Sequence, residues 1–354
     1  RNNSQDAPRF HRAMELSSQM KNRYDEGDAR IRAPRSKPRR SKDRPDYSKL
    51  PEGRVITVDR GRITLILKDG QTVIAMKARE LGKNAIVVGD LVKLDGDLSG
   101  ASGSLARAVS VLTRKNQLSR TIDDIGAQEK VVAANIDQLL IVVAAANPEP
   151  RHGFVDRCLA VAFDQGIKPI IVMTKSDLAD PSEFLSDYEP LDIEIFKSAL
   201  PREIRDTEKA LNSLSNVRAI LKGKRSVLIG HSGVGKSTLV NAITENDSRS
   251  IGDVNLATGR GRHTSSSAYA FELTGSGWII DTPGVRSFGL EHIDRNRIIS
   301  SFADLADLIK TCPKNCSHDE AGCALNTLDL SFPGENRAQR RIAGLRRILT
   351  ASQR

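Results

Sequence analysis

Residues 230–238 have the residue types and spacing of a phosphate-binding loop. Gly230 is followed by four free positions and then by Gly235, Lys236 and Ser237. Glycines let successive backbone N–H groups turn toward one centre, the lysine reaches the β- and γ-phosphates of a nucleotide, and the serine hydroxyl can bind Mg²⁺. The predicted phosphate-contacting residues are Gly230, His231, Ser232, Gly233, Val234, Gly235, Lys236, Ser237 and Thr238.

The flanking residues supply the elements that such a loop requires. Residues 226–229 form a short apolar run of strand length, and residues 238–243 have helical apolar spacing. The loop therefore joins a strand to a helix N-terminus, whose dipole favours anions. The alternative is a glycine-rich turn that binds nothing.

A second group of residues indicates which base is bound. Thr174-Lys175-Ser176-Asp177 follows the apolar run 169–173 and is close to the Asn-Lys-x-Asp motif of GTPases. Aspartate accepts two hydrogen bonds from guanine N1–H and N2–H₂, a donor pair that adenine lacks. The next strand-like run ends in Ser198-Ala199, where GTPases place a turn that contacts guanine O6. The predicted guanine-binding residues are Thr174, Lys175, Asp177, Ser198 and Ala199.

Two segments after the phosphate loop have the features of GTPase switches. Residues 259–264 lie where a first switch is expected, and Thr264 is a candidate Mg²⁺ ligand once the γ-phosphate is present. Asp281-Thr282-Pro283-Gly284 combines a Walker-B aspartate with a glycine that senses the γ-phosphate. The predicted magnesium ligands are Ser237, Thr264 and Asp281.

The order of these motifs along the chain is unusual. The base-reading motifs precede the phosphate loop and both switches, so the GTPase order is G4-G5-G1-G2-G3. Cutting the ring of GTPase elements and rejoining it elsewhere leaves the three-dimensional site intact. We therefore predict a circularly permuted P-loop GTPase domain over residues 114–290. Because the second switch leads directly into the C-terminal region, nucleotide state could be transmitted there.

Three cysteines and a histidine cluster late in the chain. The spacing Cys312-x₃-Cys316-x-His318-x₄-Cys323 provides enough ligands to close one tetrahedral structural Zn²⁺ site. The alternative is three buried cysteines without a metal, although the neighbouring residues are not typical of a core.

The remaining residues form the parts that surround these motifs. Residues 1–49 lack apolar periodicity and are predicted to be a disordered basic tail. Five period-two runs predict an all-β OB-fold barrel over residues 50–113, with strands at 54–58, 62–67, 72–76, 88–94 and 106–112. A barrel that is only a spacer is the alternative, because it lacks aromatic stacking residues.

Strand and helix patterns alternate after a polar connector at residues 114–130, which predicts an α/β domain with a parallel sheet covered on both faces. Residues 291–354 are predicted to be a zinc-binding α-helical module. It contains helices near 298–309 and 337–349, and the second is rich in arginine and expected to present a basic surface to RNA phosphates.

Composition narrows the class of partner. The 354 residues carry a formal net charge of +10 with the excess at both ends, which favours nucleic acid. No run approaches the length of a membrane span, and the clustered cysteines are typical of a reducing compartment. We expect a monomer in the cytoplasm that does not bind membranes.

The barrel, the permuted motifs with Gly261-Arg262-His263-Thr264 in the first switch, and the late Cys/His cluster together resemble the ribosome small-subunit-dependent GTPase family known as RsgA. The resemblance covers residues 50–335. It implies a factor that binds the small (30S) ribosomal subunit and its rRNA late in maturation, and that hydrolyses GTP to GDP and phosphate when docked.

The resemblance also implies a catalytic role for His263. In many small GTPases a glutamine after Asp-x-x-Gly positions the attacking water, whereas this chain has Val285, which can neither donate nor accept a hydrogen bond. In the family, the first-switch histidine takes that role when a partner orders the loop; a solvent-exposed loop residue is the alternative.

The chain departs from the family pattern at Thr174, where Asn is usual, at Ser265-Ser266, where threonines are common, and in the cysteine cluster, whose two longer gaps are each one residue shorter. Three rival functions stay open: a general P-loop ATPase, an RNA-binding module with a decayed nucleotide site, and a permuted GTPase that acts on the large subunit or another RNA.

Overall fold

The computed structural model describes residues 46–59, 61–82, 85–121, 129–199, 208–244, 268–273, 277–282, 290, 292–327 and 335–353. Residues 47–354 form one compact unit. The predicted disorder of the N-terminal tail concerns residues that lie outside this description, except for the last few. Among the described residues, no helix combines the length and apolarity needed to cross a bilayer.

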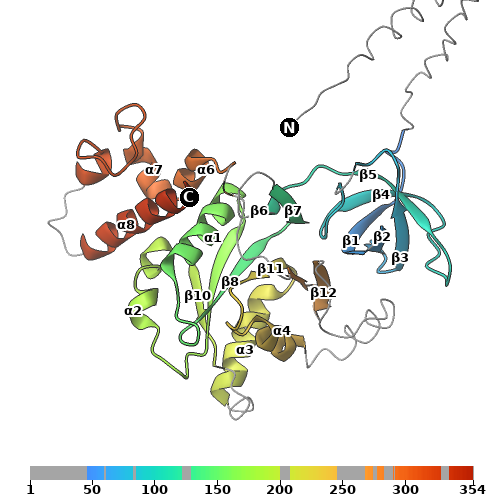
Figure 1. Cartoon of the computed structure of the whole chain (residues 1–354), viewed down its shortest axis with the longest axis horizontal. Coiled ribbons are helices and arrows are strands. Elements are labelled where there is room, and N and C mark those ends of the chain that lie inside the picture. The colour runs from blue at the N-terminus through green and yellow to red at the C-terminus, as the bar shows by residue number, and fades with distance from the viewer. Residues whose placement is uncertain are drawn as a thin grey trace, which may run out of the picture. The chain divides into compact units, whose positions relative to one another are not determined.

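The first five strands close into a small barrel (Figure 1), which confirms the predicted OB-type architecture. Neighbouring strands follow the order β1-β2-β3-β5-β4, and β4 pairs back onto β1. Alternate side chains point inward, among them Ile63, Leu65, Val73 and Val92, and form a separate apolar core. The strands are β1 (Glu52–Asp59), β2 (Arg62–Leu67), β3 (Thr72–Lys77), β4 (Leu91–Gly96) and β5 (Ala106–Val111).

The fourth strand begins later than the expected residue 88. Gly89 has φ +91°, and a Cβ there would lie 2.0 Å from the Ala134 carbonyl oxygen, so only glycine fits this close approach. Val88 forms a bridge with Ala133 instead of joining the barrel.

The expected polar connector is partly a β-hairpin. Strands β6 (Gln117–Thr121) and β7 (Glu129–Ala134) pair in antiparallel fashion, and Leu118 is buried. The Asn116 side chain extends this pairing, because it accepts a hydrogen bond from the Ile136 N–H at 2.7 Å and donates to the Ile136 carbonyl at 2.8 Å. The polar composition of the segment concealed the hairpin.

The nucleotide domain has the predicted parallel sheet. Its strands follow the order β10-β9-β8-β11-β13, all parallel to their neighbours, with β12 antiparallel to β13. Strand β12 also pairs with β1 through Tyr269 and Thr57, so one sheet runs on into the barrel. The strands are β8 (Gln138–Ala144), β9 (Lys168–Thr174), β10 (Glu194–Lys197), β11 (Arg225–Ile229), β12 (Tyr269–Leu273) and β13 (Gly277–Asp281).

Helices cover both faces of this sheet. Alternate residues of β8 divide between two apolar clusters: Leu139 and Ile141 pack with α1, while Leu140 and Val142 pack with α3 and α4. The strands are therefore apolar on both sides, as a doubly covered sheet requires. The helical segments are α1 (His152–Asp164), α2 (Ser182–Leu185), the 3₁₀ turn η2 (Glu189–Leu191), α3 (Glu208–Leu221) and α4 (Lys236–Thr244).

The C-terminal region is helical, as predicted, but the expected helix at 298–309 is two helices. Phe302 leaves the helical conformation (φ −110°, ψ 69°), and its buried ring lies 5.3 Å from that of Phe163 in α1. Side chains of the last helix share one core with α1. The elements are α6 (Arg295–Ser300), α7 (Ala303–Ile309), the 3₁₀ turn η4 (Ala324–Thr327) and α8 (Glu335–Ala351).

Candidate functional site

The phosphate loop lies between the end of β11 and the start of α4, at the centre of the parallel sheet. Gly233 and Gly235 have φ values of +81° and +93°, which favour glycine. A Cβ on Gly230 would lie 2.4 Å from the Val142 carbonyl oxygen. The fixed glycines of the motif are therefore required by the backbone of this loop.

Lys236 closes the loop. Its ammonium donates to the carbonyl oxygens of Gly230 at 2.6 Å and His231 at 2.8 Å. Burial lowers the pKa of Lys236, and the Asp281 carboxylate opposes that shift. Burial likewise raises the pKa of Asp281, and Lys236 opposes it. The predicted Walker-B aspartate is thus the electrostatic partner of the phosphate-loop lysine.

Strand pairing explains how Asp281 comes to this position. Asp281 ends β13 and is paired with Leu228 of β11, one residue before the end of that strand. Ser237, the other described candidate magnesium ligand, is exposed in the first turn of α4. Thr264, Gly284 and His263 lie outside the described residues, so their roles stay predictions.

The two predicted base-reading motifs lie side by side at the carboxyl ends of β9 and β10. The Ser198 N–H donates to the Met173 carbonyl at 2.7 Å, and the Ser176 N–H donates to the Ser198 carbonyl at 3.4 Å. Asp177 is exposed, whereas the Ser198 hydroxyl is buried with no hydrogen-bond partner among the described residues. The neighbouring Ala199 is partly buried.

Thr174 has a contact that the sequence did not indicate. Its side chain is 6% exposed, and its hydroxyl donates to the Val234 carbonyl of the phosphate loop while lying 3.2 Å from the Val143 carbonyl. Thr174 therefore joins the base-reading strand directly to the phosphate loop. Its predicted contact with guanine stays a prediction.

The loop between β8 and α1 also borders the site. The Lys175 ammonium donates to the Asn147 carbonyl, and Pro148 approaches the phosphate loop, 3.9 Å from where a Cβ of Gly233 would be. Sequence reasoning did not single out this loop. The signal in the sequence was Asn147-Pro148, which begins three residues after the end of buried strand β8.

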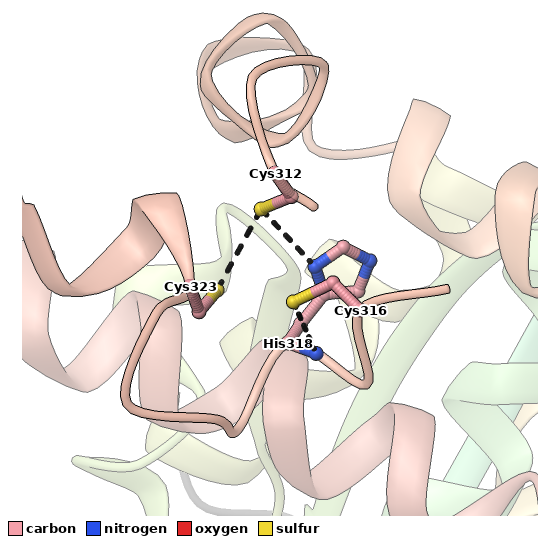
Figure 2. A group of neighbouring side chains, drawn as sticks. All are labelled: Cys312, Cys316, His318 and Cys323. Carbon is pink, nitrogen blue, oxygen red and sulfur yellow. Dashed lines mark hydrogen bonds between the residues drawn. The ribbon is translucent and has the colours of Figure 1, made fainter. Parts of the chain in front are cut away.

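The four predicted zinc ligands converge (Figure 2). The ligand atoms of Cys312, Cys316, His318 and Cys323 all lie within 4.8 Å of one another. Cys312 Sγ is 3.7 Å from both Cys323 Sγ and His318 Nδ1. Two sulfurs on one tetrahedral zinc are about 3.8 Å apart, given a Zn–S bond of about 2.3 Å. The donor set and its spacing therefore fit Zn²⁺.

Backbone geometry shows how the short cysteine loop accommodates the cluster. Asn315 and His318 adopt left-handed conformations, with φ +64° and +69°. The chain turns sharply at these two residues, which lets closely spaced ligands face one another. Backbone N–H groups of His318 and Ala324 donate to the sulfurs of Cys316 at 3.3 Å and Cys312 at 3.4 Å. Such donors stabilise thiolates in metal sites.

Most arginines of α8, the helix expected to present a basic surface to RNA, have acidic partners within the chain. Arg341 pairs with Asp192 and with Asp304, where it is bidentate, and Arg337 also pairs with Asp192. Arg347 pairs with Asp156 and Asp187, and Arg346 with Asp319. No local sequence pattern predicts these ion pairs, because the partners lie far apart along the chain. Four of its five arginines form ion pairs within the chain, whereas Arg337 and Arg340 are exposed. Contact of this helix with RNA stays a prediction.

Comparison with known proteins agrees with this geometry. The model of the RsgA GTPase family matches residues 111–291. The chain is 36% identical over 251 residues to the small ribosomal subunit biogenesis GTPase RsgA of Pseudomonas aeruginosa, covering 68% of this chain and 69% of the relative. It is 34% identical over 276 residues to the protein of the same name from Azotobacter vinelandii, covering 75% of each.

Known structures share the fold. The crystal structure of YjeQ from Thermotoga maritima matches with a TM-score of 0.57 and 23% identity, covering 83% of this chain and 97% of that one. YloQ, described as a circularly permuted GTPase, matches with a TM-score of 0.56 and 22% identity, covering 85% and 95%. The match to the family model and the identity to the Pseudomonas and Azotobacter relatives show that the chain is a GTP hydrolase that belongs to the RsgA GTPase family.

Proposed function

We propose that the chain is a GTPase of ribosome biogenesis that binds the small (30S) subunit during late maturation, and that docking stimulates GTP hydrolysis. The observation that carries the nucleotide part is the contact of the base-reading strand with the phosphate loop through Thr174. Relatives named for small ribosomal subunit biogenesis support the choice of particle. The proposal places this work in the cytoplasm.

Within the site, each group has one role. Backbone N–H groups of residues 230–238 and the Lys236 ammonium would hold the phosphates, and Asp177 would accept from guanine. Ser237, Thr264 and Asp281 would hold Mg²⁺, which neutralises phosphate charge when bound. The Lys236 ammonium donates to the carbonyl oxygens of Gly230 at 2.6 Å and His231 at 2.8 Å, so its side chain already extends over the phosphate loop.

The zinc ion would be structural. Three thiolates and one imidazole fill a tetrahedral shell and leave no position for a substrate or water. Arg346 supports the role, because it donates to the His318 carbonyl and to Asn326, each at 2.7 Å, and so joins the cysteine loop to α8. Zinc would fix the end of the chain that follows the second switch.

We propose His263 as the residue that positions the attacking water once the subunit orders the first switch. His263→Ala should therefore retain GDP binding but lose most subunit-stimulated turnover, a loss of about a hundredfold. His292→Ala, at an exposed histidine outside the site, is the matched control. Stimulated turnover that survives in His263→Ala would contradict the assignment.

The proposed partner is tested by measuring GTP hydrolysis by the full chain alone, with isolated small subunits and with isolated large subunits. The proposal predicts slow hydrolysis alone, strong stimulation by small subunits and none by large ones. Equal stimulation by both particles, or stimulation by large subunits only, would reject it.

A further inference from the structure

The first turn of α1 lies between the phosphate loop and α8. Because an α-helix turns once in 3.6 residues, Phe154 and Asp156 point to opposite sides. The Phe154 ring is 4.3 Å, centroid to centroid, from the His231 ring of the phosphate loop. On the other side, the Asp156 carboxylate meets Arg347 of α8. One helical turn thus contacts both the candidate nucleotide site and the C-terminal helix.

The contact with α8 is a buried charge pair. The Asp156 side chain is 5% exposed, and Arg347 Nε lies 3.4 Å from its Oδ2. Oδ1 of Asp156 is buried with no hydrogen-bond partner among the described residues. The Arg347 guanidinium also lies 5.4 Å from the centre of the Tyr188 ring. The Tyr188 side chain also hydrogen-bonds to Asp156. Removing Arg347 would take away the guanidinium partner of this buried carboxylate and weaken the hold of α8 on α1.

The contact with the phosphate loop determines where Lys236 is held. His231 accepts from the Lys236 ammonium through its carbonyl at 2.8 Å, while its ring packs on Phe154. Its Nε2 is buried and has no hydrogen-bond partner among the described residues, so no hydrogen bond to that nitrogen competes with the packing on Phe154. A shift of the α1 turn would therefore move the loop residue that holds Lys236.

A second contact, which involves no charge, sets how closely α8 approaches η2. A Cβ on Gly344 would lie 2.5 Å from Leu191 Cδ2 of η2, so the helix approaches η2 as closely as a glycine permits. A methyl group on Gly344 would press on the Leu191 side chain and strain the contact of α8 with η2, and it would remove no charged group.

We propose that Arg347 is a positioning residue for the nucleotide site. It holds the first turn of α1 through Asp156, and that turn holds the phosphate loop through Phe154 and His231. The inference rests on the proposed nucleotide binding by that loop. It adds that α8, which lies outside the permuted domain, influences how tightly nucleotide is bound. By linkage, bound nucleotide favours docked α8 by the same factor as docked α8 favours nucleotide.

The test measures GDP affinity of the full chain by calorimetry. Arg347→Met keeps the long apolar stem and removes the charge; it should weaken GDP binding about tenfold and speed amide exchange at residues 230–238 while the barrel strands keep their protection. Arg347→Lys should restore part of the affinity. Arg340→Met is the control, because Arg340 is exposed on α8 and pairs with no acid among the described residues.

Two further variants separate the route from a general loss of stability. Asp156→Asn with Arg347→Met should bind GDP no more weakly than the weaker single variant, because both act on one contact. Gly344→Ala should weaken GDP binding in the same direction with all charges retained.

The inference is overturned if Arg347→Met binds GDP as tightly as wild type does. It is also overturned if Arg347→Met loses amide-exchange protection equally in the barrel strands and in the parallel sheet, because that result shows a general loss of stability. A wild-type chain that does not bind GDP would contradict the proposed function itself, which separates the two failures.

Discussion

Thr174 joins two halves of the nucleotide site through one hydroxyl group. A threonine has a single O–H to donate, and here the proton goes to the Val234 carbonyl of the phosphate loop. Gly235 lies against the same side chain, since a Cβ there would be 3.6 Å from the Thr174 hydroxyl oxygen. The residue at the start of the base motif therefore determines where the phosphate loop lies relative to β9.

This geometry predicts the effect of Thr174→Val, which removes the hydroxyl and keeps the shape. GDP binding should weaken about two- to tenfold, because one buried hydrogen bond is lost and the Val234 carbonyl is left unpaired. 7-Deaza-GDP, which lacks the N7 acceptor, should lose the same factor. Thr174→Ser is the control that keeps the donor. A loss seen with GDP but not with 7-deaza-GDP would show that the hydroxyl contacts the base instead.

Residue types at fixed spacing were predictable from sequence at this scale, but their partners were not. The glycines, Lys236 and the four zinc ligands follow from chemistry that demands those side chains. The Thr174 contact and the Lys175 contact with Asn147 depend on how separate segments meet, and no local pattern encodes them.

At the scale of elements, several arginines of α8 bind acidic residues of neighbouring elements. Arg341 is 12% exposed, donates to both oxygens of Asp304 in α7, and reaches the Pro190 carbonyl at 2.8 Å. The Phe302 ring lies 5.1 Å from its guanidinium carbon. The packing of α8 against its neighbours therefore depends on ion pairs as well as on its buried apolar residues Ile342, Leu345 and Ile348.

This charge gives the docking of α8 a pH dependence. The hydrogen bond from Arg341 holds the pKa of Asp304 below its usual range. Because the folded pKa lies below the unfolded value of about 3.9, Asp304 contributes stability above that value and loses it as the pH falls through the folded pKa. Asp304→Asn should lower the unfolding midpoint at about pH 7, and the difference from wild type should shrink as the pH falls below the unfolded pKa of about 3.9. A pH-independent difference between the variant and wild type would contradict the sign of this linkage.

Sequence periodicity predicted most elements, and its failures have physical causes. Alternation revealed the barrel strands because each buries one face. The helix expected at 298–309 is interrupted because Phe302 packs on Phe163, a contact made across the fold. The hairpin β6–β7 was missed because β6 is mostly polar and its pairing is continued by the Asn116 side chain, which bonds to Ile136.

At the scale of the whole molecule, the C-terminal module is not a separate core. Ile342, Leu345 and Ile348 of α8 belong to the same apolar cluster as α1 and one face of the sheet. Buried Cys323 belongs to it too, so the zinc site borders the core of the nucleotide domain. The sequence predicted a barrel, a permuted GTPase domain and a C-terminal helical region with a Cys/His cluster. It could not predict that α8 and α1 bury their apolar side chains against each other.

Because the core is shared, we expect loss of the metal to destabilise the nucleotide domain as well as the cysteine loop. Cys316→Ser should carry well under one zinc per chain by elemental analysis and unfold at a lower temperature, because metal binding free energy is folding free energy. Cys158→Ala, at a buried cysteine outside the cluster, should retain about one zinc per chain. Full zinc content in Cys316→Ser, or none in wild type, would refute the structural zinc site.

The central claim is that the chain holds a guanine nucleotide with its phosphates at Lys236 and its base at Asp177, and calorimetry on wild type and Asp177→Asn tests it most directly. Wild type should bind GDP at least about a hundredfold more tightly than ADP. Asp177→Asn should lose GDP affinity by a similar factor and gain affinity for XDP, whose carbonyl at position 2 needs a donor. Asp180→Asn, a nearby exposed carboxylate that accepts from Ser182, should bind as wild type does. Equal binding of GDP and ADP by wild type, or unchanged GDP binding in Asp177→Asn, would contradict the account.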